Sequence, residues 1–213
     1  RALEARIESL ELAFRMQFAA PEAFDISRES KATHDLYGIG PEPTKGIAGG
    51  RKYGGFAEGA LVARRLSERG VRVVQLAFAP DIPWDDHTDI NDHRPKAFEC
   101  DQAIAALLTD LEQRGLLDET LVLLVSEFGR TWPMSGSCDH WPGDAVCFAG
   151  GNTHGNRMIG GYDLTTGSPS SIGFLGKPVD LLDEAGQPMN RPPWARDTIF
   201  TALHMMGVPD VFL

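Results

Sequence analysis

Residues Leu121–Trp141 read LVLLVSEFGRTWPMSGSCDHW and join an apolar run to a polar loop. The apolar part, Leu121–Val125, predicts a strand that is buried on both faces. The loop that follows carries Glu127, Arg130 and the pair Asp139–His140. In open α/β sheets, ligands bind beyond the carboxyl ends of the strands. We therefore expect a site at the end of this strand.

Helical and strand patterns alternate around this run. Phe56–Arg69 and Ala97–Arg114 have helical spacing of apolar residues, and the β-branched run Val71–Ala77 predicts a second strand. The alternation predicts an α/β fold, a mostly parallel sheet with helices on both faces. We expect a single domain over residues 1–213, in which residues 27–55, rich in Gly and Pro, form a long loop or insertion. Further helices or strands are predicted at Ala2–Phe18, Ala145–Ala149 and Thr198–Met206.

The composition narrows the classes of partner. The chain has 213 residues and a formal net charge of −10. Nucleic-acid binding needs a basic face, so this charge argues against a nucleic-acid partner. No run approaches the roughly 18 apolar residues of a membrane span. The sequence starts directly in a predicted helix without Met, so we expect a fragment or a processed chain. A periplasmic or secreted location would need an export signal on the parent chain.

A second polar loop, Pro83–His93, reads PWDDHTDINDH and follows the second predicted strand. Parallel strands would bring both loops to one edge of the sheet. Asp85 and His87 are candidate metal ligands, because mixed carboxylate and imidazole ligands suit Zn²⁺, Mn²⁺ or Fe more than Ca²⁺. The alternative is a solvated acidic loop. Asp92 and His93 are interpreted as surface and capping residues before the next helix.

The loop after Leu121–Val125 also has more than one interpretation. Glu127 and Arg130 could form a local ion pair, or Arg130 could capture a phosphate or sulfate through both ends of its guanidinium. Asp139 could orient the ring of His140, as outer partners do in metal sites, or satisfy backbone N–H groups in the loop. The remaining histidines are interpreted as solvated or packing side chains: His34, His154 and His204.

Several motifs together carry a family resemblance from about Tyr53 onward. They are Ala63–Leu76, Trp84–His87, Asp110–Thr131, Asp139–Trp141, Ala149–Gly151 and the closing helix Asp197–Val208. In combination they resemble the domain of unknown function 1501, an uncharacterised group in the alkaline phosphatase and sulfatase superfamily. The resemblance implies an alkaline phosphatase-like α/β sandwich with a metal site at the strand ends.

The resemblance also implies roles for individual residues. Two metals would be held by Asp and His side chains from several strand ends, with Asp85 and His87 matching the first loop. His140 would be the last His of the site. Glu127 stands where sulfatases and cofactor-independent mutases carry the Asp of an Asp-His-Gly, and Phe128 replaces the His, which removes one ligand of the second metal.

A second alignment makes Asp139 and His140 the Asp-His pair, as in the phosphatases. The superfamily's nucleophile and its first metal-binding Asp lie near the N-terminus of the full domain. No matching segment is seen here, so the resemblance implies the C-terminal part of an N-terminally truncated member.

The expected function is metal-dependent hydrolysis of a small anionic phosphate or sulfate ester, possible only with the nucleophile segment. Asp85, His87 and His140 would hold one metal, Zn or Mn first, with Ca, Mg or Fe as alternatives. Glu127 would assist at a second metal or orient water, and Arg130 would neutralise the oxyanion. The alternatives are a non-catalytic metal-binding or structural module of the same fold and a metal-dependent redox enzyme.

Overall fold

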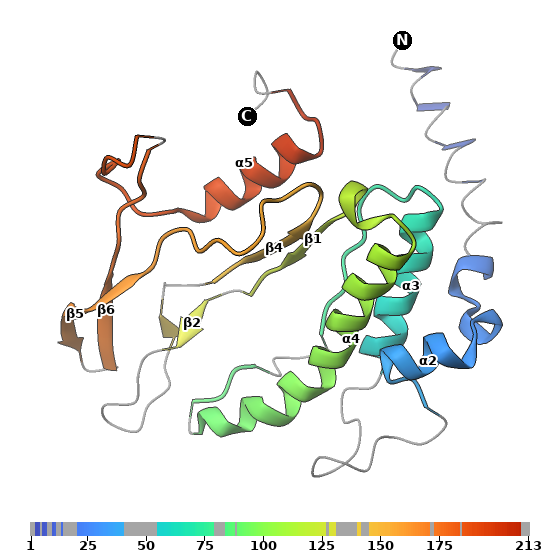
Figure 1. The fold of residues 1–213 in the computed structure, drawn as a ribbon, viewed down its shortest axis with the longest axis horizontal. Helices are drawn as coiled ribbons and strands as arrows, with labels where there is room; N and C mark the ends of the chain where they lie inside the picture. The colour runs from blue at the N-terminus through green and yellow to red at the C-terminus, as the bar shows by residue number, and fades with distance from the viewer. Residues whose placement is uncertain are drawn as a thin grey trace. The chain divides into compact units, whose positions relative to one another are not determined.

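The structure is a computed structural model. It describes residues 3–4, 6–7, 10–11, 14, 21–40, 55–78, 84–87, 89–126, 128–130, 140–141, 145–170, 173–183 and 185–209. The chain divides into two compact units (Figure 1). The first comprises Arg1–Pro83 and Arg94–Gln113, and the second comprises Trp84–His93 and Arg114–Leu213.

The first unit is helical. Its elements are η1 Ile26–Arg28, α2 Lys31–Tyr37, α3 Phe56–Glu68 and α4 His93–Gln113, whose first residue belongs to the second unit. Helix α2 begins where the Ser30 side chain accepts a hydrogen bond from the Thr33 backbone, 3.1 Å away. It ends at Gly38, whose φ of 72° lies in the left-handed region that only glycine adopts easily. This helix lies within residues 27–55, of which 41–54 are outside the described part.

The core of the first unit is built mostly from small side chains. Buried alanines of α3 and α4 and the Tyr37 side chain of α2 belong to one cluster. The buried residues of this cluster are Tyr37, Ala57, Ala60, Leu61, Ala103 and Ala106. Arg64 of α3 is also buried, at 1% exposure, and its guanidinium pairs with the carboxylates of three residues: Glu29 at 2.8 Å, Glu68 at 2.6 Å and Asp110 at 2.9 Å. The first unit therefore contains a buried ion network as well as an apolar core.

The second unit carries the described strands. Its elements are η2 Ile90–Asp92, η3 Leu117–Glu119, β1 Leu121–Leu124, β2 Gly129–Arg130, β3 His140–Trp141, β4 Cys147–Gly150, β5 Tyr162–Ser170, β6 Gly173–Pro178 and α5 Ala195–Met205. The strands form three two-stranded sheets, β1–β4, β2–β3 and β5–β6, and all three pairs are antiparallel. Leu121 pairs with Gly150 at one end of the first sheet and Leu124 with Cys147 at the other.

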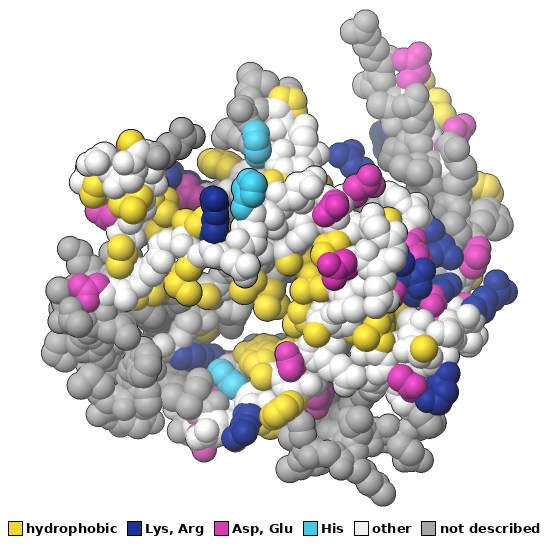
Figure 2. Space-filling model, in the orientation of Figure 1, with side chains coloured by type: hydrophobic (Ala, Val, Ile, Leu, Met, Phe, Trp, Pro, Cys, Tyr) yellow, Lys and Arg dark blue, Asp and Glu magenta, His cyan; other side chains and the backbone are white. Residues whose placement is uncertain are grey.

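The prediction of a mostly parallel, alkaline phosphatase-like α/β sheet is wrong. Within the described ranges every strand pair is antiparallel, and Val71–Ala77 forms no strand. Strand propensity depends on a partner that supplies ladder hydrogen bonds and packing, and among the described residues no segment pairs with Val71–Ala77. Val73 in this segment is exposed, and so are Leu124 and Val125 at the end of β1. Figure 2 shows apolar side chains at the surface of the visible face.

Other local predictions are confirmed with shifted boundaries. β1 and β4 fall where strands were predicted, and α4 begins four positions before the predicted helix start at Ala97. α5 begins at Ala195, because the Asp197 carboxylate accepts from the backbone N–H of Trp194, 2.7 Å away, and so caps the helix from inside its first turn. The hairpin β5–β6 was not predicted from the loop-like sequence of that region.

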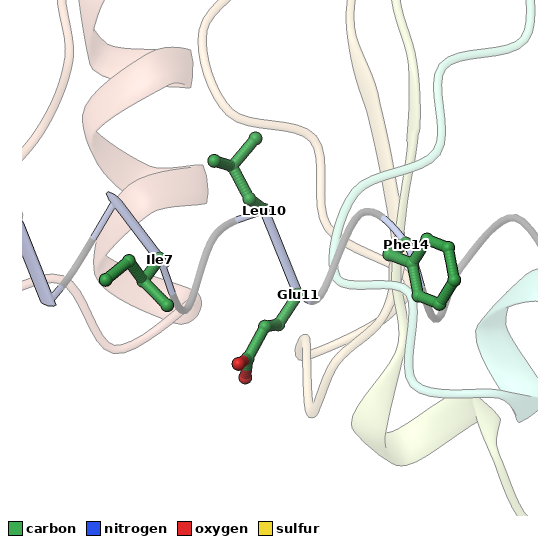
Figure 3. Close-up of a pocket in the computed structure, with 4 residues that line it drawn as sticks. All are labelled: Ile7, Leu10, Glu11 and Phe14. Atoms are coloured by element: carbon green, nitrogen blue, oxygen red, sulfur yellow. The ribbon is translucent and has the colours of Figure 1, made fainter.

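The described residues near the N-terminus are helical, as predicted for Ala2–Phe18. Four of them, Ile7, Leu10, Glu11 and Phe14, line a shallow hollow at the surface (Figure 3). Among the helices of the described ranges, none is both long and apolar enough to cross a bilayer.

A candidate metal site at Asp85, His87 and His140

A tight turn in the second unit presents the first two candidate ligands. The backbone N–H of Asp86 donates to the carbonyl oxygen of Trp84, 3.0 Å away, so residues 84–87 bend sharply. This bend carries Asp85 and His87. The His87 Nε2 lies 3.0 Å from the Asp85 Oδ1. The Asp-x-His spacing thus places a carboxylate and an imidazole side by side without any help from a regular strand.

The short β2–β3 pair presents the other two side chains. Arg130 lies opposite His140 in the antiparallel register, and residues directly opposite each other project from the same face. Both side chains reach the same atom of the turn. Arg130 donates from Nη2 to Asp85 Oδ1 at 2.6 Å, and His140 donates from Nε2 to that oxygen at 2.8 Å. The register places Arg130 opposite His140, and the contacts of both side chains with Asp85 join the two polar loops.

One carboxylate oxygen is thus the centre of the cluster. Potential ligand atoms of Asp85, His87 and His140 all lie within 4.8 Å of one another. The Asp85 side chain is 21% exposed, and each imidazole is 46% exposed. The site is open to solvent, so a small ion could reach it.

The charge state of Asp85 suits cation binding. Hydrogen bonds from His140 and Arg130 hold the pKa of the Asp85 carboxyl well below its usual range, because they stabilise the ionised form. The neighbouring His87 and the charge of Arg130 act in the same direction. Asp85 is therefore a carboxylate over the whole physiological pH range.

Aromatic contacts flank the imidazole of His140. The ring of Phe128 lies 4.1 Å from it, centroid to centroid, at an angle of 32°. The ring of His87 lies 5.0 Å from it on the same measure. The Arg130 guanidinium lies 5.4 Å from the centre of the Phe128 ring. Phe128, which was predicted to occupy the place of a metal-binding His, here packs against a candidate ligand.

The donor set fits a divalent transition metal. Two imidazoles and one carboxylate are a usual protein ligand set for catalytic zinc, where a further position is left to water or substrate. The same ligands also serve manganese and non-haem iron, whereas calcium and magnesium favour oxygen alone. Asp85, His87 and His140 are the residues that could hold such an ion.

The structure brings together Asp85, His87, Arg130 and His140, all of which were candidates from the sequence. Arg130 pairs with Asp85 across a long separation in sequence. The other two candidates, Glu127 and Asp139, lie outside the described residues.

Two features of the site were not predicted. The carbonyl oxygen of Trp84 accepts hydrogen bonds from Arg130 at 3.1 Å and from the ring of His93 at 2.7 Å. His93 was interpreted as a surface and capping residue, but its ring is only 21% exposed. Trp84 and His93 are nine positions apart, a spacing that matches no helix or strand period. Their contact is therefore visible only in the folded structure.

The second unit is thus a strand-containing unit with an open cluster of side chains, of which Asp85, His87 and His140 could hold a metal ion. By sequence, the chain belongs to a family described as "Protein of unknown function (DUF1501)", which matches residues 1–174. No curated protein and no solved structure matches the chain.

Proposed function

We propose that this protein binds a divalent transition metal ion, zinc or manganese, through Asp85, His87 and His140. The observation that carries the proposal is the convergence of one carboxylate and two imidazoles within 4.8 Å of one another. The ligands come from two loops far apart in sequence, and two separate devices bring them together, a tight turn and a strand register. A solvated acidic loop would need neither.

The substrate class that we propose is a small anionic ester of phosphate or sulfate. It follows the family resemblance, and it is supported by the guanidinium of Arg130, which lies 2.6 Å from the central carboxylate oxygen. A metal bound by three protein ligands would polarise an ester oxygen and lower the pKa of a bound water. Asp85, His87 and His140 would bind the ion, and Arg130 would neutralise the charge that develops on the ester oxygens.

Metal binding is tested by titrating metal-free protein with Zn²⁺ and Mn²⁺ in a calorimeter and by measuring the metal content after dialysis. We expect wild-type protein to retain the ion. The variants His87→Ala and His140→Ala should lose more than about 100-fold in affinity, because even outer partners of metal ligands are worth about 10–100-fold. His154→Ala, which alters another exposed histidine of the second unit, is the matched control. Unchanged affinity in both site variants would contradict the proposal.

The hydrolase part of the proposal needs a second experiment. Metal-loaded protein is assayed against a panel of aryl phosphates and aryl sulfates, with Arg130→Met as the variant that lacks the guanidinium. Turnover that depends on the metal and falls in Arg130→Met supports ester hydrolysis. Metal retention without turnover of any ester would instead assign a non-catalytic metal-binding module.

A further inference from the structure

We infer that His93 is a positioning residue of the metal site, because its ring holds both neighbours of Asp85 and so sets the turn that presents Asp85 and His87. The inference rests on the proposed metal-binding function and extends it to a residue outside the ligand set. Each contact of His93 described below lies within the second unit.

The ring of His93 contacts the residue before Asp85 and the residue after it. Its Nε2 donates to the carbonyl oxygen of Trp84 at 2.7 Å and lies 3.3 Å from the Asp86 carboxylate. The ring also packs edge to face against the Trp84 indole, with centroids 5.5 Å apart at 77°. One side chain therefore restrains the backbone and side-chain positions on both sides of the central ligand.

His93 is itself well held. It is the first residue of α4, a helix that runs to Gln113, and the η2 turn leads directly into it. That turn is closed by Asp89, whose carboxylate accepts from the backbone N–H of Asn91 at 2.9 Å and whose carbonyl accepts from the N–H of Asp92 at 3.0 Å. The hydrogen bonds of the η2 turn therefore restrain the backbone that leads into His93.

The carbonyl oxygen of Trp84 accepts hydrogen bonds from two side chains, His93 and Arg130. It accepts from His93 on one side and from Arg130 Nη2, 3.1 Å away, on the other, and the same Nη2 contacts Asp85 Oδ1. When Asp85 binds a cation, its contact with Arg130 competes with that ion. The hydrogen bond from His93 to the Trp84 carbonyl oxygen involves no ligand atom. It can therefore stabilise the turn while Asp85 binds the metal ion.

The role of His93 differs from that of a ligand. Within the described ranges, the group of side chains able to share one ion contains Asp85, His87 and His140, and His93 is not a member. Its Nε2 is directed to a carbonyl oxygen instead. Hydrogen bonds that orient metal ligands from outside the ligand set change affinity by about 10–100-fold.

The test compares His93→Met with His93→Gln. The two replacements have similar length and shape, but only Gln retains an N–H that can donate to the Trp84 carbonyl. Affinity for Zn²⁺ is measured by competition with a chelator, and the visible spectrum of the Co²⁺-substituted protein reports the ligand geometry. We expect His93→Met to bind Zn²⁺ about 10–100-fold more weakly with an altered Co²⁺ spectrum, and His93→Gln to recover most of both.

His34→Met is the matched control. The His34 ring also contacts a backbone carbonyl, that of Ile26 at 3.0 Å, eight positions earlier, but in the first unit. Its loss should leave Zn²⁺ affinity and the Co²⁺ spectrum unchanged. If circular dichroism shows that His93→Met does not fold, His93→Phe replaces it as the donor-free variant, because it keeps a ring against Trp84.

The outcomes separate this inference from the proposed function. Failure of wild-type protein to bind Zn²⁺ overturns both. Wild-type binding with equal affinity in the folded donor-free variant overturns the positioning role of His93 and leaves the metal site standing. Equal losses in the Gln variant and the donor-free variant also overturn it, because the packing of the ring, rather than its hydrogen bond, would then be responsible.

Discussion

Arg64 in the first unit and Asp85 in the second are each a charged side chain shared by three partners. Arg64 is 1% exposed and contacts the carboxylates of Glu29, Glu68 and Asp110. Asp85 is 21% exposed and contacts Arg130 and the imidazoles of His87 and His140. The two clusters resemble each other in connectivity, but they differ in burial and in the nature of the partners.

The two clusters differ in burial, and the more exposed one is the candidate metal site. Arg64, Glu29 and Asp110 are largely shielded from water, so removing Arg64 leaves buried carboxylates without the charge that compensates them. The imidazoles around Asp85 are each 46% exposed, so they are accessible to an ion from solvent.

The largest effect is expected when the buried centre is removed. Arg64→Leu should lower the free energy of unfolding by about 3–5 kcal/mol, because Glu29, Asp110 and Glu68 lose the charge that compensates them. Urea unfolding followed by circular dichroism measures the change. Arg69→Leu, which removes a more exposed arginine of the same region, should cost no more than about 1 kcal/mol. An equal loss of unfolding free energy in Arg64→Leu and Arg69→Leu would show that the buried network stabilises the fold no more than an exposed ion pair does.

Asp85, the centre of the exposed cluster, should contribute to metal binding rather than to the stability of the metal-free protein. Zinc at about 100 times its dissociation constant should stabilise wild-type protein by about 2.7 kcal/mol. Asp85→Asn should lose this gain, yet its metal-free stability should stay close to that of wild type, because surface ion pairs contribute little to stability. Thermal unfolding with zinc and with chelator measures both quantities. An undiminished gain in Asp85→Asn would remove the carboxylate from the site.

The buried network should also respond to acid. Burial by itself raises the pKa of Glu29, but hydrogen bonds from Arg64 and Arg65 outweigh it, so the pKa lies below its ordinary value of 4.5. A lowered folded pKa stabilises the protein above the unfolded value, and this stabilisation is lost as the pH falls through the folded value.

Glu29→Gln should therefore be about 1.5–3 kcal/mol less stable than wild type at neutral pH, through loss of bonds between charged groups. The difference should shrink as the pH falls below 4.5, because wild-type Glu29 then becomes neutral too. Urea titrations across this range give the two curves, and Glu119→Gln in exposed η3 is the control. A difference that is constant with pH would contradict the assignment.

The smallest effect is expected at the aromatic flank of the site. Phe128→Leu should weaken zinc binding by about two- to tenfold, since an aromatic pair such as Phe128–His140 contributes about 0.5–1.5 kcal/mol. Phe148→Leu, in strand β4, should leave the affinity unchanged. Chelator competition resolves such differences. A loss as large as that of His140→Ala would instead give Phe128 a share in holding the ligand set together.

Local sequence signals located α3, α4, α5 and the candidate side chains, but they missed α2, which lies within the predicted loop 27–55. Helical spacing of apolar residues marked α3 and α4, and the loop after the second predicted strand supplied Asp85 and His87 as candidates. These signals succeed because helix hydrogen bonds join residues four apart, so the information lies within a short window. The same window could not show that Arg64 would be buried or that His93 would hold Trp84.

The sequence by itself determined which chemical groups the protein carries and where its main helices lie. The tertiary structure decided how strands pair, which charges are buried and which side chains meet. Val71–Ala77 has strand propensity yet forms no strand, because a strand needs a partner that only the folded chain supplies. Arg130 and His140 converge on Asp85 for the same reason: these contacts join segments that are distant in sequence, and no local pattern encodes them.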